Sequence, residues 1–178
     1  IMLVRIKRQK GPNENSYWQS FEYNGSLDAT VVTVINSINY TDDIYDIEGN
    51  HAERIRWECS CMQGVCGGCA MIINGKPSLA CDTFLKDLKS EELILEPLSK
   101  FPVIADLMVD RSIIYKNLQQ AKLYLNDRSE VLKKDHPHRY SISKCLKCGL
   151  CLEVCPNYQY GKDFFGGLFA NEAYLIYS

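Results

Sequence analysis

The chain has 178 residues, of which 46% are hydrophobic and 24% are charged, and its formal net charge is −2. These values are ordinary for one large or two small globular domains, and they give no reason to expect a nucleic-acid partner. No apolar stretch approaches the roughly 18–20 residues that a membrane span needs, so we expect any membrane association to go through a partner. The chain has nine cysteines, and because no signal-peptide pattern opens the sequence, we expect a reducing compartment rather than disulfides.

The first forty residues indicate a β-hairpin followed by a helix. Apolar and polar residues alternate over residues 3–8 and 17–23, on either side of the turn-prone residues 11–15. After Thr30, a candidate N-cap, apolar residues recur at helical spacing: Val31, Val34, Ile35 and Ile38. Because β-branched residues have poor helix propensity, we expect this helix to depend on packing against a sheet.

Four cysteines in the next segment have the spacing of an iron–sulfur site. Cys61, Cys66 and Cys69 form a C-x4-C-x2-C pattern and Cys81 follows, as in the plant-type [2Fe–2S] loop. Glycine lacks Cβ and lets the backbone approach the sulfurs closely. The glycines between these ligands are Gly64, Gly67 and Gly68. We expect Cys81 to arrive from a strand, which would hold the fourth ligand on a rigid element.

A zinc site is the main alternative for these cysteines. Zinc sites usually pair two C-x2–4-C knuckles, whereas here one short knuckle accompanies a remote cysteine. Cys59 lies two residues before Cys61. We interpret Cys59 as a bystander packed beside the cluster, with ligand exchange as the alternative.

Three further strands are predicted in the first hundred residues. Residues 70–74 and 79–81 flank a predicted turn at residues 75–77, and residues 92–96 form the last strand. Five short strands with one crossing helix indicate a compact α+β domain.

The composition changes near residue 100, where we place the boundary between domains 1–102 and 103–178. The spacing of apolar residues predicts a helix of about six turns over residues 104–125, with no convincing strand after Pro102. Residues 127–144 are polar and are predicted to link this helix to a second group of cysteines.

The second group of cysteines has the spacing of a two-cluster ferredoxin. It runs Cys145-x2-Cys148-x2-Cys151-x3-Cys155 and is followed by Pro156. In such a run the first three cysteines ligate one cluster and the fourth ligates a different one. No cysteine follows Cys155, so the site is incomplete. Either Cys155 closes a lone [4Fe–4S] cluster, or the chain is a fragment, which is the interpretation that we favour.

The remaining candidates are weaker. No histidine has the Cys-x-His arrangement of a Rieske site, and we interpret all three as ordinary exposed or core residues: His51, His136 and His138. No G-x-G-x-x-G follows a strand, so no flavin or nicotinamide site is expected. The aromatic residues after Pro156 are interpreted as core, with a quinone border as the alternative. They are Tyr158, Tyr160, Phe164, Phe165 and Phe169.

These motifs resemble, over nearly the whole chain, the iron–sulfur subunits of the succinate dehydrogenase and fumarate reductase family. The matching stretches are residues 17–23, 61–81, 97–107 and 145–156. The cysteine motifs alone are moderately specific, whereas their order together with the linking segment is highly specific. Residues 148–151, Cys-Gly-Leu-Cys, are more similar to the fumarate reductase branch.

The resemblance implies a β-grasp [2Fe–2S] ferredoxin-like domain followed by an all-α helical ferredoxin domain, which is incomplete here. The implied ligands are Cys61, Cys66, Cys69 and Cys81 for a [2Fe–2S] cluster, Cys145, Cys148 and Cys151 for a [4Fe–4S] cluster, and Cys155 for a [3Fe–4S] cluster. Family members carry a further cysteine run after this point. They also often place a tryptophan near the quinone, where this chain has Tyr160, a few residues after Pro156.

The function that the resemblance implies is electron transfer between two partners. One partner is an FAD-containing flavoprotein subunit and the other is a membrane anchor with quinone, which places the chain peripherally on the cytoplasmic side of the inner membrane. The chain itself would carry single electrons and perform no bond chemistry. Two alternatives stay open: an electron-transfer subunit of another flavoenzyme or thiol-dependent reductase, and a zinc-stapled interaction module.

Overall fold

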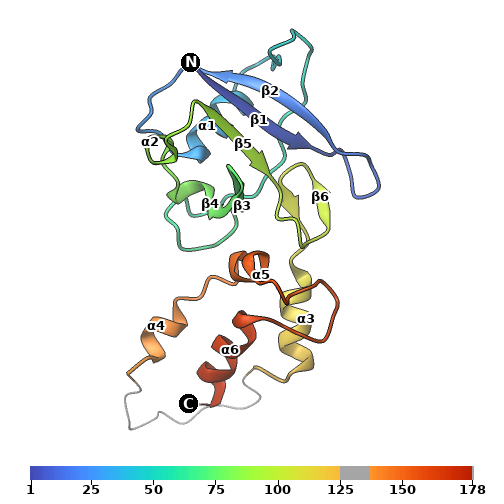
Figure 1. Ribbon diagram of the computed structural model, residues 1–178, viewed down its shortest axis with the longest axis vertical. Helices are drawn as coiled ribbons and strands as arrows, with labels where there is room; N and C mark the ends of the chain where they lie inside the picture. Colours follow the sequence, from blue (N-terminus) through green and yellow to red (C-terminus); the bar gives the residue numbers. More distant parts are fainter. Residues whose placement is uncertain (125–136, 178) are drawn as a thin grey trace. The chain divides into compact units, whose positions relative to one another are not determined.

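The computed structural model describes residues 1–124 and 137–177, which belong to two compact units, Ile1–Asp110 and Arg111–Ser178 (Figure 1). The first unit thus extends beyond the predicted boundary after Pro102. The predicted end of the helix at Leu125 and residues 127–136 of the predicted link, which include His136, lie outside the described residues.

The first unit is built on a five-stranded mixed sheet. Its strands are β1 Met2–Arg8, β2 Tyr17–Tyr23, β3 Ala70–Ile73, β4 Lys76–Leu79 and β5 Glu92–Glu96. They lie in the order β2-β1-β5-β3-β4, so the first and the last strand of the sheet in sequence are neighbours within it. The strand β1 pairs antiparallel with β2 and parallel with β5, with Val4 opposite Leu93 in the parallel pair. The predicted α+β arrangement is therefore confirmed.

One helix, α1 Val31–Asn39, covers one face of this sheet (Figure 1). Alternate residues of β1 are buried, as expected for a strand with one covered face. The helix buries the apolar residues Val31, Val32, Val34, Ile35 and Ile38. Thr30 holds the N-cap position but makes no capping bond, and its Oγ1 lies 3.3 Å from Thr33 Oγ1. Packing against the sheet therefore stabilises this helix, as predicted from its β-branched residues.

The strands around the last cysteine of the first group differ from the prediction. The turn is made by Asn74 and Gly75, with φ of 46° and 77°, and not by residues 75–77. Asn-Gly is a strong signal for a two-residue hairpin turn, so Lys76 already begins β4. Pro77 is accommodated because β4 is an edge strand. Cys81 lies on a short 3-10 helix, η1 Ala80–Asp82, so its expected position on a strand was wrong.

The prediction of a continuous helix after Pro102, without strands, was also wrong. After the short helix α2 Leu85–Leu88 and strand β5, the chain forms a hairpin of β6 Val103–Ala105 and β7 Met108–Val109. A helix, α3 Ser112–Gln120, begins only after this hairpin. The spacing of Ile104, Leu107 and Met108 is compatible with a helix, but Asp106 has a φ of 46°, which turns the chain back. Asp tolerates this left-handed conformation better than most residues.

A buried ion pair fastens this hairpin to the sheet. Arg8 is 2% exposed and Asp106 is 3% exposed, and Arg8 Nε lies 2.9 Å from Asp106 Oδ1. Arg8 Nη2 also donates to Asp106 Oδ2 at 3.1 Å, and Arg8 Nη1 donates to Gln19 Oε1 at 2.7 Å. The carboxylate further accepts the backbone N–H groups of Gln9 and Arg56. Because both ions are hydrogen-bonded, their burial is tolerated, and the hairpin belongs to the first unit.

The described residues of the second unit form helices. They are α3, α4 Arg139–Ser143, α5 Leu150–Val154 and α6 Gly167–Tyr177. The helix α4 lies in the segment predicted to be a polar link, because it packs on α6. Arg139 Nη2 donates to Leu175 O, and Asn171 Nδ2 donates to Ile142 O, both at 3.3 Å. In the part of the chain that the structure describes, no helix is both long enough and apolar enough to span a bilayer.

Candidate metal centres

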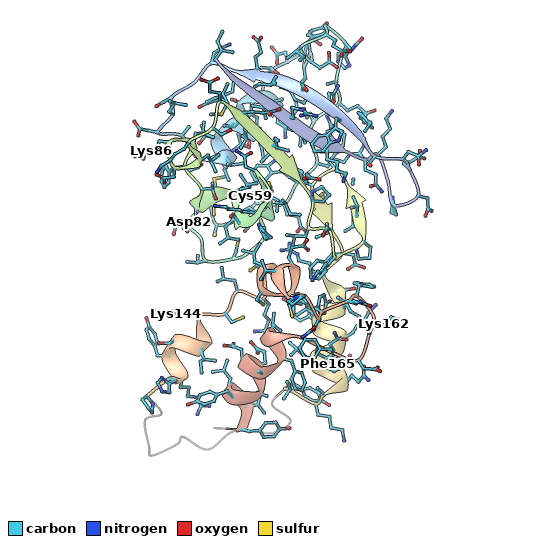
Figure 2. All side chains as sticks on the ribbon, viewed as in Figure 1. Cys59, Asp82, Lys86, Lys144, Lys162 and Phe165 are labelled. Carbon is cyan, nitrogen blue, oxygen red and sulfur yellow. The ribbon has the colours of Figure 1, made fainter. Side chains whose placement is uncertain are left out.

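The structure brings the four candidate ligands of the first group, Cys61, Cys66, Cys69 and Cys81, together as an outer pair and an inner pair. Cys61 and Cys66 lie on the loop before β3, where Cys61 is partly buried and Cys66 is exposed. Cys69 directly precedes β3 and Cys81 lies on η1; both are buried, and their Sγ atoms are 3.3 Å apart. In Figure 2 the labelled residues Cys59 and Asp82 mark the two ends of the segment that contains these four cysteines. Two pairs of thiols match a two-iron cluster, in which each iron takes two cysteine ligands.

Contacts with the backbone hold the inner pair in place. Ala80 N donates to Cys69 O at 3.1 Å and Cys81 N donates to Cys69 Sγ at 3.4 Å. Thr83 Oγ1 donates to Leu79 O at 2.9 Å, and Thr83 O accepts the N–H of Val31 at the start of α1. The short helix η1 is therefore tied to β4 and α1, and it provides the rigidity that the sequence interpretation had assigned to a strand.

Backbone N–H groups of the loop point at the sulfurs. The donors are Gln63 and Val65 to Cys61 Sγ, Gly64 to Cys81 Sγ and Gly68 to Cys66 Sγ, with N···S distances of 3.2–3.4 Å. Such hydrogen bonds stabilise negative charge on sulfur, whether on a free thiolate or on a bound cluster. The loop therefore presents an anion-stabilising surface to whatever the cysteines bind.

The two pairs differ in their electrostatics. The N–H groups of Gln63 and Val65, and then the thiol of Cys66, lower the pKa of Cys61 to about 7. Burial raises the pKa of Cys69 to about 12. The outer pair is thus polar and accessible, whereas the inner pair is shielded by the core. An electron would enter or leave such a cluster most easily through its outer side.

Two glycines of the loop are required by the path of the chain. Gly64 and Gly67 have φ of 69° and 76°, in the left-handed region that favours glycine. At Gly68, an added Cβ would lie 3.6 Å from Cys66 Sγ, which is an ordinary van der Waals contact. The close backbone approach predicted from the sequence is therefore not what requires glycine at position 68.

Replacing Gly64 with alanine should destabilise the loop. The left-handed backbone at this position costs a residue with a Cβ about 1–2 kcal/mol, and Gly64 N is the donor to Cys81 Sγ. We expect a lower urea midpoint and faster loss of bound iron. Gly11→Ala is the matched control, because its added Cβ would meet only Glu14 Cγ at 3.8 Å. Equal effects of the two substitutions would contradict this account.

Cys59 packs against the core beside this site. It is partly buried, and burial, followed by the neighbouring thiol of Cys81, raises its pKa. Burial raises the pKa of Cys69 in the same way, so the pKa does not separate Cys59 from the four candidate ligands. The assignment of Cys59 as a bystander stays a prediction.

The second group of cysteines surrounds the start of α5. Lys147 and Gly149 have φ of 52° and 87°, which bends the chain between Cys145, Cys148 and Cys151. Burial raises the pKa of Cys151, and the neighbouring thiols of Cys148 and Cys145 raise it further. The first three cysteines of the second group are therefore neighbours.

Cys155 ends the run at the C-terminal end of α5, where its N–H donates to Leu152 O at 3.3 Å. Across residues 1–124 and 137–177, no group of three or more His, Cys, Asp or Glu residues is arranged to hold a single metal ion.

Three residues that support the second cysteine loop were missed in the sequence interpretation. Lys147 Nζ lies 3.1 Å from Glu172 Oε1, and Glu172 is only 7% exposed. Arg111 Nη1 donates to Cys148 O at 3.3 Å. The signal for Lys147 was its position between two ligand cysteines; nothing in the sequence pattern pairs it with Glu172, which lies on α6.

The other predicted site residues are placed as follows. Pro156 and Tyr160 are exposed, and Tyr160 keeps 38% of its surface accessible. His51 stacks edge-on against Tyr45, with ring centroids 5.8 Å apart. His138 is exposed at the N-cap position of α4.

Comparison with known proteins agrees with this arrangement. Residues 3–116 match the family described as "2Fe-2S iron-sulfur cluster binding domain". The chain is 32% identical over 169 residues to the succinate dehydrogenase iron-sulfur subunit of Bacillus subtilis, an alignment covering 90% of this chain and 66% of that protein. It is 35% identical over 130 residues to the fumarate reductase iron-sulfur subunit of Haemophilus influenzae, covering 62% of this chain and 50% of that protein.

Among solved structures, a chain of the Mycobacterium smegmatis Sdh1 complex in the apo form superposes with a TM-score of 0.65 and 25% identity, covering 86% of this chain and 63% of that one. The chain therefore spans between half and two thirds of the length of these proteins. The predicted resemblance to succinate dehydrogenase and fumarate reductase iron–sulfur subunits and the α+β ferredoxin-like fold are both confirmed. The chain belongs to the family of 2Fe–2S iron–sulfur cluster binding domains.

Proposed function

We propose that the chain is the electron-transfer iron–sulfur subunit of a succinate dehydrogenase or fumarate reductase complex. The observation that carries this proposal is the arrangement of Cys61, Cys66, Cys69 and Cys81 in two pairs within a loop of N–H donors. Relatives that carry both names support it. The two pairs fit a [2Fe–2S] cluster, which would accept and release one electron at a time.

The residues of this chain would hold that cluster and set its properties. The inner pair would anchor one iron in the core, and the outer pair would keep the other near the surface. Backbone N–H groups directed at sulfur stabilise the more negative, reduced form and so raise the reduction potential. Burial of the inner pair acts in the opposite direction, because it disfavours added charge. The balance of these two effects is the means by which this fold would tune the cluster.

The partners and the location belong to the same proposal. An FAD-containing flavoprotein would exchange electrons with the [2Fe–2S] cluster, and a membrane anchor with quinone would lie at the other end of the relay. The exposed residues Pro156 and Tyr160 are the proposed quinone neighbours. Attachment through these subunits would place the chain on the cytoplasmic side of the inner membrane.

Further clusters are proposed for the second unit, within a helical ferredoxin domain that follows the β-grasp domain. Cys145, Cys148 and Cys151 would bind a [4Fe–4S] cluster, and their proximity supports this. Cys155 would ligate a [3Fe–4S] cluster. The cysteines present fit only part of these two sites, because three thiols serve the first and one serves the second.

Iron quantification on the chain of residues 1–178 tests this assignment. We expect about two irons per chain, the content of one [2Fe–2S] site, because the second group lacks a complete ligand set. Dithionite should reversibly bleach the visible absorbance and produce a one-electron paramagnetic signal. A stable four-iron cluster on this chain, lost in Cys155→Ser, would instead show that Cys155 completes a self-contained site. A colourless protein with stoichiometric zinc would refute the electron-transfer function.

A further inference from the structure

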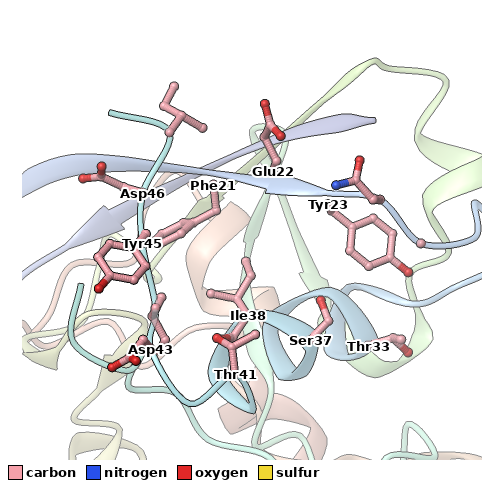
Figure 3. Close-up of a pocket in the computed structure, with 14 residues that line it drawn as sticks. Phe21, Glu22, Tyr23, Thr33, Ser37, Ile38, Thr41, Asp43, Tyr45 and Asp46 are labelled. Carbon is pink, nitrogen blue, oxygen red and sulfur yellow. The ribbon is translucent and has the colours of Figure 1, made fainter. Parts of the chain in front are cut away.

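A surface groove of about 690 Å³ lies between β2, α1 and the loop of residues 41–47 of the first unit, and no cysteine lines it (Figure 3). Its floor is apolar and well packed. The side chains that form this floor are Phe21, Tyr23, Ile38 and Ile44, each no more than 7% exposed. The floor of the groove is therefore part of the hydrophobic core of the first unit.

One wall of the groove is the free edge of a strand. β2 is the outermost strand of the sheet, next to β1. Ile47 N donates to Ser20 O at 2.9 Å, so the backbone C=O of Ser20 points away from β1. Alternate residues of a strand share this orientation, which places the backbone N–H and C=O of Glu22 on the same outer edge. An extended segment could therefore continue the pairing that Ile47 begins.

The opposite wall presents hydrogen-bond acceptors. Ser37 Oγ donates to Val34 O at 2.7 Å, and Thr41 Oγ1 donates to Ile38 O at 2.8 Å. Each hydroxyl has one proton, so only its lone pairs remain for a ligand. Figure 3 shows Ser37 projecting from α1 toward β2. A ligand that satisfies this wall has to bring N–H or O–H donors.

The charged side chains along the groove also favour a ligand that brings hydrogen-bond donors. Glu22, Asp43 and Asp46 line the groove, and no lysine or arginine does so among the described residues. The Glu22 carboxylate projects from β2 on the side opposite Phe21 and Tyr23 (Figure 3), where it faces the alternate side chains of a segment paired with this edge. Asp46 accepts hydrogen bonds from the backbone N–H of Asn50 and, more weakly, from the side chain of Gln19, and both lower its pKa. Glu22 and Asp43 form no ion pair in the part of the chain that the structure covers. Two carboxylates are thus available to cations from outside.

We propose that this groove binds an extended segment of a partner protein that carries lysine or arginine side chains. The segment would pair with the edge of β2 at Glu22, place its apolar side chains on the floor, and direct its cationic groups to Glu22 and Asp43. Strand pairing supplies main-chain hydrogen bonds, and charge-assisted bonds to the carboxylates supply selectivity. The site is separate from the cysteine loop, so this proposal does not depend on the electron-transfer function.

The test is titration of the purified chain, with its bound iron, with a capped peptide of alternating valine and lysine. We expect saturable binding with one site by calorimetry, and no binding of the matched valine–glutamate peptide. The variant Glu22→Lys/Asp43→Lys should weaken binding more than tenfold, and Ser37→Phe, which fills the groove without a charge change, should do the same. Visible absorbance of each variant checks that the fold and the cysteine loop are intact.

The control variant is Glu14→Lys/Glu91→Lys, which changes the net charge equally at two exposed acids outside the groove. It should bind the peptide like the unchanged chain. Equal weakening in this control, or no effect of Ser37→Phe, would show nonspecific charge attraction and overturn the proposal. Spermidine that binds as tightly as the peptide with the same dependence on Glu22 and Asp43 would identify a small polycation as the occupant, and would also overturn it.

Discussion

Replacing Cys66 with serine should abolish the visible absorbance that the first unit contributes. Cys66 is one of the outer pair, and its Sγ accepts the N–H of Gly68 at 3.4 Å. Serine keeps the shape of the side chain but offers a far weaker ligand than thiolate, so the iron on the outer side would lose one of its two protein ligands. We expect iron in this chain to fall from about two per chain to near zero, measured by absorbance and by iron quantification.

Cys59→Ser is the matched control for this substitution. Cys59 lies in the same segment and is partly buried against the core, but we do not expect it to bind iron. It should therefore keep the full absorbance. Bleaching in Cys59→Ser combined with normal colour in Cys61→Ser would show that the ligand set has been misassigned.

Removing the charge of Asp106 should destabilise the first unit by about 3–5 kcal/mol, the usual cost of leaving one member of a buried ion pair without its partner. Arg8 is 2% exposed, and in Asp106→Asn its charge would stay buried beside a neutral amide. Asparagine also tolerates the left-handed backbone at this position, so the path of the chain is unchanged. Its NH2 group cannot accept a hydrogen bond, so one of the backbone N–H groups of Gln9 and Arg56 loses its acceptor as well. Urea unfolding followed by tryptophan fluorescence measures the effect, because both tryptophans, Trp18 and Trp57, lie in this unit.

The control is Asp28→Asn, which removes an exposed ion pair with Lys86 at 3.0 Å. Its side chain is 79% exposed, so we expect no measurable shift of the urea midpoint. Equal midpoints for Asp106→Asn and the unchanged chain would mean that the hairpin of residues 103–109 contributes nothing to the first unit. The unit boundary would then belong after Pro102, as predicted from the sequence.

Much of the first unit could be predicted from local patterns. Alternation over residues 3–8 and 17–23, and helical spacing after Thr30, are signals carried by neighbouring residues, and the structure confirms the strands and the helix. The cysteine spacing likewise predicts a family that the comparisons confirm. These predictions succeeded because the relevant information lies within a few residues.

The failures arose where distant residues decide the structure. The apolar residues from Ile104 onward have helical spacing, yet Asp106 forms a turn because it reaches Arg8, 98 positions earlier in the chain. Cys81 lies on η1 because its N–H contacts Cys69 Sγ, and Lys147 is held by Glu172 on α6. The groove beside β2 depends on where the loop of residues 41–47 lies against the sheet. Such contacts cannot be predicted from the pattern of residues that are neighbours in the sequence.

The pairing of β1 with β5 at the centre of the sheet determines when the cysteine loop becomes ordered during synthesis. Lys7 and Glu96 meet across this pairing although 89 positions separate them, and all four candidate ligands lie in between. Contacts so far apart in sequence form late, because closing a long loop costs chain entropy before the contact repays it. Cys61 and Cys81 precede β5 and Asp106 in the chain and leave the ribosome first, so the thiols of a nascent chain are exposed to solvent, oxidants and competing metals. Iron therefore has to be delivered after the second half of the first unit has been synthesised, or the cysteines have to be shielded until that half is present.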